Sequence, residues 1–293
     1  MFTFTGMNAL NIPEAFSRSP DIPDTLVHSY SSDAEITLKS RITITSHLFS
    51  FLLEGEKEVH FNEDSFRCGP DKAVLFTSGN CLMTERSSPT KHYRSLLFFF
   101  SDARLAEVRN KYPDLFAVSG GRRTSFVLAQ DEFIRAFVAS LQQIESRGAG
   151  LAGPLLKLKL EELMLYLAHT YPETFPAFVS TLGVESPEGR FKNVVENNTY
   201  SNLTLDELAF LCHMSLSTFK RRFESLYGMP PIRWFQEKRM QQAAHLLRYR
   251  QRKASDIYME LGYENLSSFI QAFKKEFGVT PKTYQGDRRQ MAK

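Results

Sequence analysis

The sequence predicts an α+β protein in which an N-terminal antiparallel β-barrel or jelly roll, followed by helices, precedes an all-α C-terminal domain. Three observations lead to this prediction. Short runs that alternate between hydrophobic and polar residues follow one another over residues 26–100. A helical segment is repeated in the C-terminal third, fifty residues apart. The charge also divides, because residues 1–189 carry 18 basic and 23 acidic side chains whereas residues 190–293 carry 18 and 10.

The composition is that of a soluble globular chain. Its 293 residues, 42% of them hydrophobic and 13% aromatic, suffice for two buried cores. The first thirteen residues lack a leader-peptide pattern and the apolar runs are too short to cross a bilayer, so we expect a cytoplasmic protein without membrane contact. Cys68, Cys81 and Cys212 are widely spaced, which favours reduced, buried thiols over a disulfide framework or a metal cluster.

The N-terminal half has the alternation and the turns of a compact antiparallel sheet. Hydrophobic runs such as Leu48–Leu53 and Leu96–Phe100 are typical of its strands. Turn-forming sequences separate the runs, at Glu54–Gly55, Asn62–Asp64, Gly69–Asp71 and Ser78–Asn80. We therefore expect seven or eight strands rolled into a small barrel or jelly roll.

Two helices are expected after the strands, at about residues 131–146 and 154–170, on either side of a break at Gly148–Gly150. The first carries one apolar stripe, formed by Phe133, Phe137, Leu141 and Ile144. The second has more leucines than one narrow stripe can hold, among them Leu155, Leu158, Leu163 and Leu167. Such a helix needs neighbours on more than one side, and two interpretations stay open: it packs on the barrel, or it pairs with a second copy of the chain.

The polar segment 183–189 is the best candidate for a domain boundary, because it separates the acidic part of the chain from the basic part. The first domain then covers residues 1–182 and the second covers residues 190–286. The basic surplus makes the second domain a candidate for a polyanion partner, although a solvated basic face would look the same by charge alone.

The repeat in the second domain consists of seven coincident positions. Phe219, Phe223, Tyr227, Gly228, Met229, Pro231 and Trp234 correspond to Phe269, Phe273, Phe277, Gly278, Val279, Pro281 and Tyr284. This agreement in one register predicts a duplicated helical module.

Each copy reads as two short helices joined by a tight turn. In the first copy, Thr204 and Glu207 form a capping box that starts one helix, and a second helix begins at Ser215 or Leu216. Its inner face holds phenylalanines, which leaves Ser217, Lys220 and Arg221 outside at the spacing of a helix that enters a major groove. A single copy is also compatible with an ordinary helical hairpin that has a basic outer face.

The second copy and the spacer favour a DNA-binding function. The second copy leaves Ser267, Ile270 and Gln271 outside. Between the copies, Pro231–Tyr249 predicts one helix of nineteen residues, about 28 Å long. Two readers held about one DNA turn apart, roughly 34 Å, can enter successive major grooves on one side of a duplex.

These motifs resemble the DNA-binding domain of the AraC/XylS family of bacterial transcription regulators. The resemblance is carried by Asp256–Ile257, Gly262–Tyr263, Ser268–Phe269, Phe273–Lys274, Phe277–Val279, Pro281 and Tyr284, with Arg239–Met240 and Leu246–Leu247 in the spacer. It covers about one hundred residues. The N-terminal half resembles the family's cupin-like effector and dimerisation domain by pattern alone.

The resemblance implies a set of DNA contacts. Base contacts fall on Ser217, Lys220 and Arg221 and on Ser267, Ile270 and Gln271, and contacts with the DNA backbone fall on Arg239, Lys274, Thr280 and Lys282. Arginine and lysine donate to guanine O6 and N7, while glutamine pairs with adenine N6 and N7. One departure from the family is Tyr258, which stands where a small residue is usual, four positions before the turn glycine. We therefore expect the first copy to supply most of the base-specific affinity.

The N-terminal domain offers two kinds of candidate chemistry. Five phenylalanines, Phe49, Phe51, Phe76, Phe98 and Phe100, are candidates for lining an effector pocket, although small barrels usually fill their interiors with such side chains. His28, His47, His60 and His92 are too scattered for a metal-dependent active site, so we expect no metal, no cofactor and no catalytic residues. The segment 159–165 resembles a helix of the family's type III secretion activators, which respond to a protein partner.

The leading hypothesis is a sequence-specific transcription regulator that binds double-stranded promoter DNA. The resemblance implies an activator, a homodimer, contact with RNA polymerase, and an N-terminal domain that responds to a small molecule or a protein. The alternative is a cupin-type small-molecule sensor or enzyme whose helical half only mediates assembly.

Overall fold

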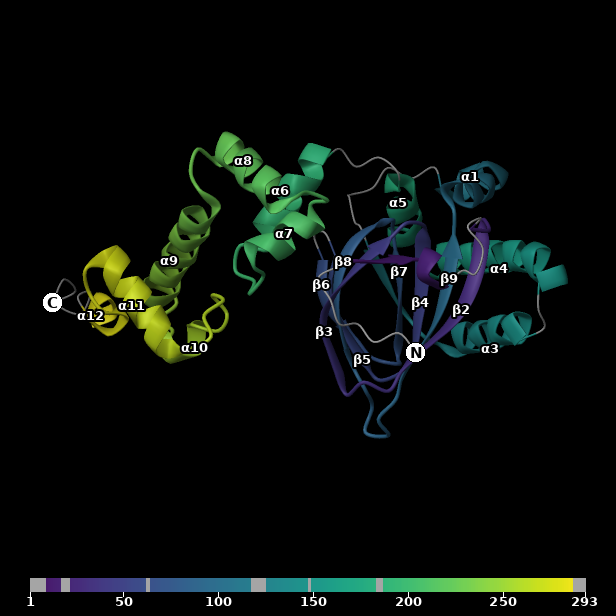
Figure 1. The fold of residues 1–293 in the computed structure, drawn as a ribbon, viewed down its shortest axis with the longest axis horizontal. Helices are drawn as coiled ribbons and strands as arrows, with labels where there is room; N and C mark the ends of the chain where they lie inside the picture. Colours follow the sequence, from purple (N-terminus) through teal and green to yellow (C-terminus); the bar gives the residue numbers. More distant parts are fainter. Residues whose placement is uncertain are drawn as a thin grey trace. The chain divides into compact units, whose positions relative to one another are not determined.

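The structure, a computed structural model, describes residues 9–16, 22–61, 64–116, 125–146, 149–182 and 187–286. The chain forms two compact units, Met1–Arg190 and Phe191–Lys293 (Figure 1). Of the expected boundary segment 183–189, residues 183–186 lie outside the described residues, and helix α6 (Pro187–Asn197) begins at Pro187.

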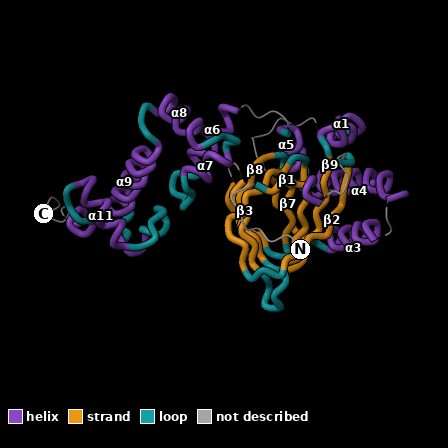
Figure 2. The backbone as a smooth tube through the Cα atoms, viewed as in Figure 1, coloured by secondary structure: helices purple, strands orange, loops and turns teal. Residues whose placement is uncertain are grey.

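The N-terminal unit contains two five-stranded sheets (Figure 2). One has the order β1-β3-β8-β5-β6, with β1 (Leu10–Ile12), β3 (Ile36–Ile44), β8 (Gly79–Arg86), β5 (Glu56–Phe61) and β6 (Asp64–Cys68). The other has the order β10-β7-β4-β9-β2, with β10 (Ser125–Ala129), β7 (Lys72–Phe76), β4 (His47–Glu54), β9 (Tyr93–Phe100) and β2 (Thr25–Ser32). All neighbours are antiparallel except β1 and β3. The described strands outnumber the expected seven or eight because β1 and β10 lie outside the alternating region.

The second sheet is the middle layer of this unit. One of its faces meets the first sheet, and the other meets a group of helices, with α3 and α4 beside β2 and β9 (Figure 1). These helices are α1 (Asp102–Lys111), α2 (Pro113–Phe116), α3 (Glu132–Ser146), α4 (Ala149–Thr170) and α5 (Thr174–Thr181). Because β4 and β9 are buried on both faces, their sequences are continuous hydrophobic runs rather than alternating ones.

Helices α3 and α4 occur where the sequence predicts them, with two differences. Helix α4 begins at Ala149, five residues earlier than expected, and contains Pro154. Because proline lacks a backbone N–H, residue 154 donates no hydrogen bond within this helix. On α3 the buried residues are Ile134, Phe137, Val138 and Leu141, while the expected Phe133 stacks on Tyr166 with ring centres 3.8 Å apart.

The C-terminal unit is entirely helical in its described part. It contains the remainder of α6, then α7 (Leu205–Leu211), α8 (Leu216–Tyr227), α9 (Pro231–Tyr249), α10 (Ala254–Ile257), α11 (Leu266–Phe277) and α12 (Pro281–Gly286). The pairs α7–α8 and α10–α11 are the two predicted helix-turn-helix units, and α9 is the nineteen-residue spacer helix. The predicted capping box is present, since Glu207 N donates to Thr204 Oγ1 at 3.2 Å and Thr204 N donates to Glu207 Oε2 at 2.7 Å.

The seven repeated positions have the same structural role in both copies. Gly228 and Gly278 end α8 and α11 in the left-handed conformation, with φ angles of 71° and 76°. The proline after each glycine begins the next helix, and the aromatic residue three positions later packs on the recognition helix. The ring of Trp234 lies 5.6 Å from that of Phe223, and the ring of Tyr284 lies 5.3 Å from that of Phe273.

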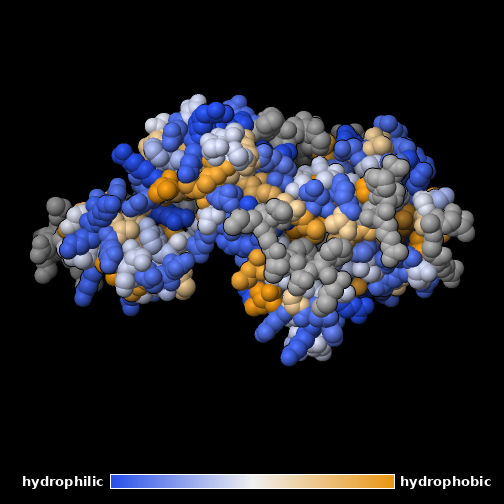
Figure 3. Space-filling view, viewed as in Figure 1, coloured by the Kyte–Doolittle hydropathy of each residue, from blue (hydrophilic) through white to orange (hydrophobic). Residues whose placement is uncertain are grey.

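The side chains of Cys68, Cys81 and Cys212 are all buried. In the part of the chain that the structure describes, no helix is both long and apolar enough to cross a bilayer. The visible surface over α9, α11 and α12 is mainly hydrophilic, whereas an apolar patch covers β3, where Ile36 and Leu38 are exposed (Figure 3).

Replacement of Phe223 by alanine tests the aromatic packing of the first unit. Because Phe223 is fully buried, we expect the free energy of unfolding to fall by about 3–5 kcal/mol. Trp234, the only tryptophan in the chain, contacts this ring and reports on the unit by its fluorescence during denaturation. Leu226→Ala, on the same helix but exposed, should change the midpoint little; equal effects of the two variants would contradict the packing argument.

Candidate nucleic-acid interface

Helix α8 presents a polar outer face because its inner face is occupied by two fully buried phenylalanines, Phe219 and Phe223. The helix starts at a serine cap, where Thr218 N donates to Ser215 Oγ at 3.2 Å. This start and this inner face leave Ser217, Lys220 and Arg221 exposed. The three side chains predicted to contact bases therefore lie on one face of one helix.

Helix α11 repeats this arrangement with different chemistry. Asn265 Oδ1 accepts a hydrogen bond from Ser268 N at 2.8 Å, and Phe269 and Phe273 are fully buried. Ser267 and Gln271 are exposed, as predicted for base contacts. Ile270 is half-buried and packs at the edge of the core, so only part of its side chain can reach outward.

The two outer faces differ in the donors that they offer. Lys220 and Arg221 form no ion pair with any described carboxylate, so their N–H groups are available to a ligand. Arginine can contact guanine O6 and N7 with two parallel hydrogen bonds. Gln271 and Ser267 are neutral, so the first unit carries the stronger positive charge on its recognition face.

The residues predicted to contact the DNA backbone are found in two settings. Lys274 and Lys282 are exposed near the end of α11 and the start of α12. Thr280 caps α12, because its Oγ1 accepts a hydrogen bond from Thr283 N at 3.3 Å.

Arg239 differs from this expectation. Its guanidinium is half-buried, and it donates to the carbonyl oxygens of Ser201 at 2.7 Å and Thr199 at 3.4 Å. Burial lowers the pKa of Arg239 below its usual value. At least two of its donor directions are therefore used within the protein, which makes an exposed phosphate contact a poor description of this residue.

The turn of the second helix-turn-helix unit contains Tyr258. Helix α10 is only four residues long and is followed by the half-buried Tyr258 as its C-cap, whereas α7 has seven residues. Tyr263 N then donates to the carbonyl of Tyr258 at 3.0 Å, which closes the turn. The first helix of the second unit is thus shorter than its counterpart.

The five phenylalanines proposed for an effector pocket do not line one space. Phe49, Phe51, Phe98 and Phe100 belong to the core between the middle sheet and the helices, whereas Phe76 belongs to the core between the two sheets. The separation follows from the pleat, because neighbouring residues of a strand point to opposite faces. All five rings are at most 1% exposed and act as core residues here.

A buried polar cluster that the sequence analysis missed lies between the two sheets. Lys57 and Glu85 are directly opposite each other on β5 and β8, and both are nearly inaccessible. Lys57 Nζ donates to Ser50 Oγ at 2.7 Å, and Tyr30 Oη donates to Glu85 Oε2 at 3.0 Å. Lys57 precedes the buried Val59 by two residues and the buried Phe61 by four, so the alternation of the strand puts its side chain on the same buried face. This alternation is the sequence signal that predicts a buried position for Lys57.

The environment of this cluster shifts its proton affinities. Burial raises the pKa of Glu85 to about 7, and hydrogen bonds from Tyr30 together with the charge of Lys57 partly oppose the shift. Burial lowers the pKa of Lys57. The free space beside the cluster is about 30 Å³, enough for a water molecule but far below the 300–1,000 Å³ of a typical ligand pocket.

Helix α4 divides the leucines that were predicted to mediate self-association. Leu163 and Leu167 are fully buried against the sheet and cannot meet a second chain. Leu155 and Leu158 are exposed, the latter by 62%. Packing on the sheet therefore accounts for Leu163 and Leu167, whereas the role of Leu155 and Leu158 in self-association stays a prediction.

The histidines are separate from one another in the structure. His47 Nε2 lies 2.8 Å from Asp102 Oδ1, His60 Nδ1 lies 3.0 Å from Ser65 Oγ, and His92 Nδ1 lies 3.0 Å from Asp33 Oδ1. The described residues contain no group of three or more His, Cys, Asp or Glu side chains arranged to hold a metal ion.

Comparison with known families identifies two domains in the chain. A family model described as the ExsA N-terminal regulatory domain matches residues 47–178, and one described as a helix-turn-helix domain matches residues 208–287. The second match contains both candidate recognition helices.

Several curated proteins resemble the chain over part of its length. Thermoregulatory protein LcrF of Yersinia pestis is 36% identical over 128 residues, which cover 43% of this chain and 47% of that protein. The HTH-type transcriptional regulator ExsA of Pseudomonas aeruginosa is 32% identical over 126 residues, which cover 42% of this chain and 45% of that protein. The chain thus spans about half the length of the curated relatives that it matches.

Solved structures resemble the chain more distantly. An apo form of ToxT from Vibrio cholerae covers 90% of this chain and 98% of that chain, with 13% identity and a TM-score of 0.45. The DNA-binding domain of AdpA in complex with a target DNA covers 36% of this chain and 96% of that chain, with 24% identity and a TM-score of 0.34.

The buried Glu85 predicts a specific dependence of stability on pH. Its pKa in the folded chain is raised from 4.5 to about 7, so the folded chain retains a proton there that the unfolded chain has released. The free energy of unfolding should therefore fall as the pH rises from about 4.5 to about 7, by up to about 3 kcal/mol. Urea denaturation across this range should show the decrease in the parent and not in Glu85→Gln. Glu56→Gln, an exposed neighbour, is the control and should keep the parent's slope; an unchanged slope in Glu85→Gln would refute the assignment.

Proposed function

This chain belongs to the AraC/XylS family of transcription regulators, and we propose that it activates transcription by binding a specific sequence in double-stranded promoter DNA. One observation carries the proposal. Helix α8 exposes Ser217, Lys220 and Arg221, and helix α11 exposes Ser267 and Gln271 at the positions that match Ser217 and Arg221, with a nineteen-residue spacer helix between the two. Two recognition helices in one chain fit a DNA site with two separated blocks of specified bases.

The proposed roles of the side chains follow from their exposure and charge. Lys220 and Arg221 read guanine in the first half-site, and Gln271 reads adenine in the second. Lys274 and Lys282 hold the DNA backbone and add affinity that does not depend on sequence. The first unit supplies the larger share of specific affinity, since it carries both basic recognition residues.

Activation rather than repression is supported by the relatives. Virulence regulon transcriptional activator VirF of Yersinia enterocolitica is 36% identical over 43% of this chain. An activator must also contact the transcription machinery, so we propose that RNA polymerase is a partner and that the protein acts in the cytoplasm.

The N-terminal unit is proposed to dimerise and to receive the regulatory signal. Its match to a regulatory domain model over residues 47–178 supports this role. The exposed Leu155 and Leu158 on α4 offer an apolar surface for a second copy of the chain. The small space between the sheets favours a protein partner over a small molecule as the effector, since a ligand would have to displace core side chains.

Substitution of Arg221 tests base recognition. In a gel-shift titration, Arg221→Ala should weaken binding to the preferred sequence by about 1–3 kcal/mol and relax the preference at one base pair. Lys282→Ala is the matched comparison, because a backbone contact should weaken binding to all sequences alike and reduce the salt slope by about one. An Arg221→Ala protein with unchanged affinity and preference would contradict the assignment. Lack of any sequence-dependent binding by the parent would favour the alternative in which the helical unit only mediates assembly.

Substitution of Leu158 tests dimerisation. Leu158→Glu places a charge on the exposed face of α4, so sedimentation at micromolar concentration should show a shift from dimer to monomer. Leu38→Glu adds the same charge at a similarly exposed leucine on β3, and should leave the dimer intact. A parent chain that sediments as a monomer with and without DNA would rule out the proposed dimer.

A further inference from the structure

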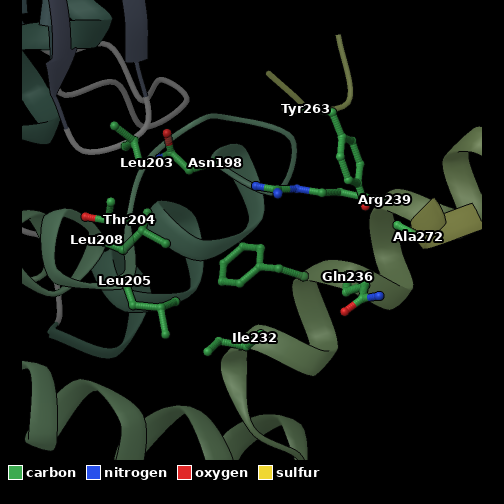
Figure 4. Close-up of a pocket in the computed structure, with 11 residues that line it drawn as sticks. Asn198, Leu203, Thr204, Leu205, Leu208, Ile232, Gln236, Arg239, Tyr263 and Ala272 are labelled. Carbon is green, nitrogen blue, oxygen red and sulfur yellow. The ribbon is translucent and has the colours of Figure 1, made fainter. Parts of the chain in front are cut away.

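Arg239 connects the spacer helix to the first helix-turn-helix unit. It lies in the middle of α9, and its Nη2 and Nε donate to the carbonyl oxygens of Ser201 and Thr199, in the segment between α6 and α7. Figure 4 shows its side chain extending from α9 toward the segment of Asn198 and Leu203. The guanidinium thereby fixes the start of the first unit relative to the spacer.

The turn of the second helix-turn-helix unit lies close to the guanidinium of Arg239. Gly262 has a φ angle of 78°, and a β-carbon there would lie 3.0 Å from Asn202 Oδ1, 3.0 Å from the carbonyl oxygen of Tyr200 and 3.2 Å from Cζ of Arg239. Residues with a β-carbon rarely adopt this φ angle, and the surrounding atoms would have to move by a few tenths of an ångström to admit one. The two helix-turn-helix units and the spacer helix α9 therefore meet around the guanidinium of Arg239.

A cleft lies beside this junction. It has a volume of about 370 Å³ and is lined by Leu205 and Leu208 of α7, Gln236 of α9, and Tyr263 and Ala272 of the second unit (Figure 4). Arg239 and Tyr263 line this cleft, so the hydrogen bonds of Arg239 and the close contact at Gly262 contribute to the angle between the two helix-turn-helix units.

We propose that Arg239 is a positioning residue that sets the rotation and distance between α8 and α11, and through them the spacing of the two DNA half-sites. The inference rests on the proposed DNA-binding function. Successive major grooves on one side of a duplex are about 10–10.5 base pairs apart, so a change in the angle between the readers costs contacts in one groove. A lysine cannot replace the arginine fully, because it lacks the planar fork that reaches two carbonyl groups at once.

The test compares a complete operator with half of it. The preferred sequence is first selected from random DNA with the full chain, and three duplexes are then made: the complete site, the first half-site alone, and the complete site lengthened by one base pair. The proteins are the parent, Arg239→Met, Arg239→Lys and Gly262→Ala, with Arg233→Met as the control. Arg233 is on the same helix with a 73% exposed side chain, so its loss removes the same charge without affecting the junction.

Arg239→Met should lose about tenfold in affinity for the complete site and less than twofold for the half-site, and it should discriminate less against the lengthened site. Gly262→Ala should show the same pattern, Arg239→Lys an intermediate one, and Arg233→Met none. Circular dichroism establishes that each variant is folded, and Arg239→Lys carries the test if the methionine variant is not.

Three results would overturn the inference. Equal losses on the complete site and the half-site, with a reduced salt slope, would identify Arg239 as a contact to the DNA backbone. Unchanged binding to all three duplexes would show that the junction does not depend on it. Failure of the parent chain to enrich any sequence would contradict the proposed function itself, and the inference with it.

Discussion

The packing of one buried phenylalanine in each recognition helix determines how the C-terminal unit presents its surface. Phe223 and Phe273 are fully buried, and each contacts an aromatic ring from the helix that follows, Trp234 or Tyr284. That contact requires the chain to reverse directly after the recognition helix, which the left-handed glycine achieves in both copies. With the inner face fixed in this way, the residues at the remaining helical positions must point outward. The recognition faces are thus a consequence of core packing, and their chemistry is free to differ.

The N-terminal unit is governed by a different constraint, namely a sheet that is buried on both faces. Strands β4 and β9 pack against the other sheet on one side and against the helices on the other. The aromatic side chains that would fill a simple barrel therefore divide between two cores. The exposed part of α4 and the buried pair Lys57 and Glu85 are the features of this unit that core packing alone does not explain.

Much of this architecture is predictable from local patterns. The capping box at Thr204, the glycine-proline signals and the spacing of phenylalanines identify the helical units, because these signals act within a few residues. The failures involve contacts between segments distant in sequence. Phe49 packs against helices, and the alternation within its strand does not predict that helices cover this face of the sheet. The role of Arg239 depends on carbonyl groups about forty residues away in the sequence. The buried position of Lys57 is predictable because it lies two residues before the buried Val59 on the same strand. Its pairing with Glu85 on β8 is not predictable from the sequence.

Selection of binding sites from random double-stranded DNA by the 293-residue chain tests the central claim most directly. Two recognition helices in one chain should enrich a sequence with two blocks of specified bases, their centres about 10 base pairs apart, with guanine prominent in the block read by Lys220 and Arg221. Enrichment of a single block of bases would contradict the proposal that both α8 and α11 contact bases. Absence of enrichment above the level of non-specific binding would contradict DNA recognition by this chain altogether.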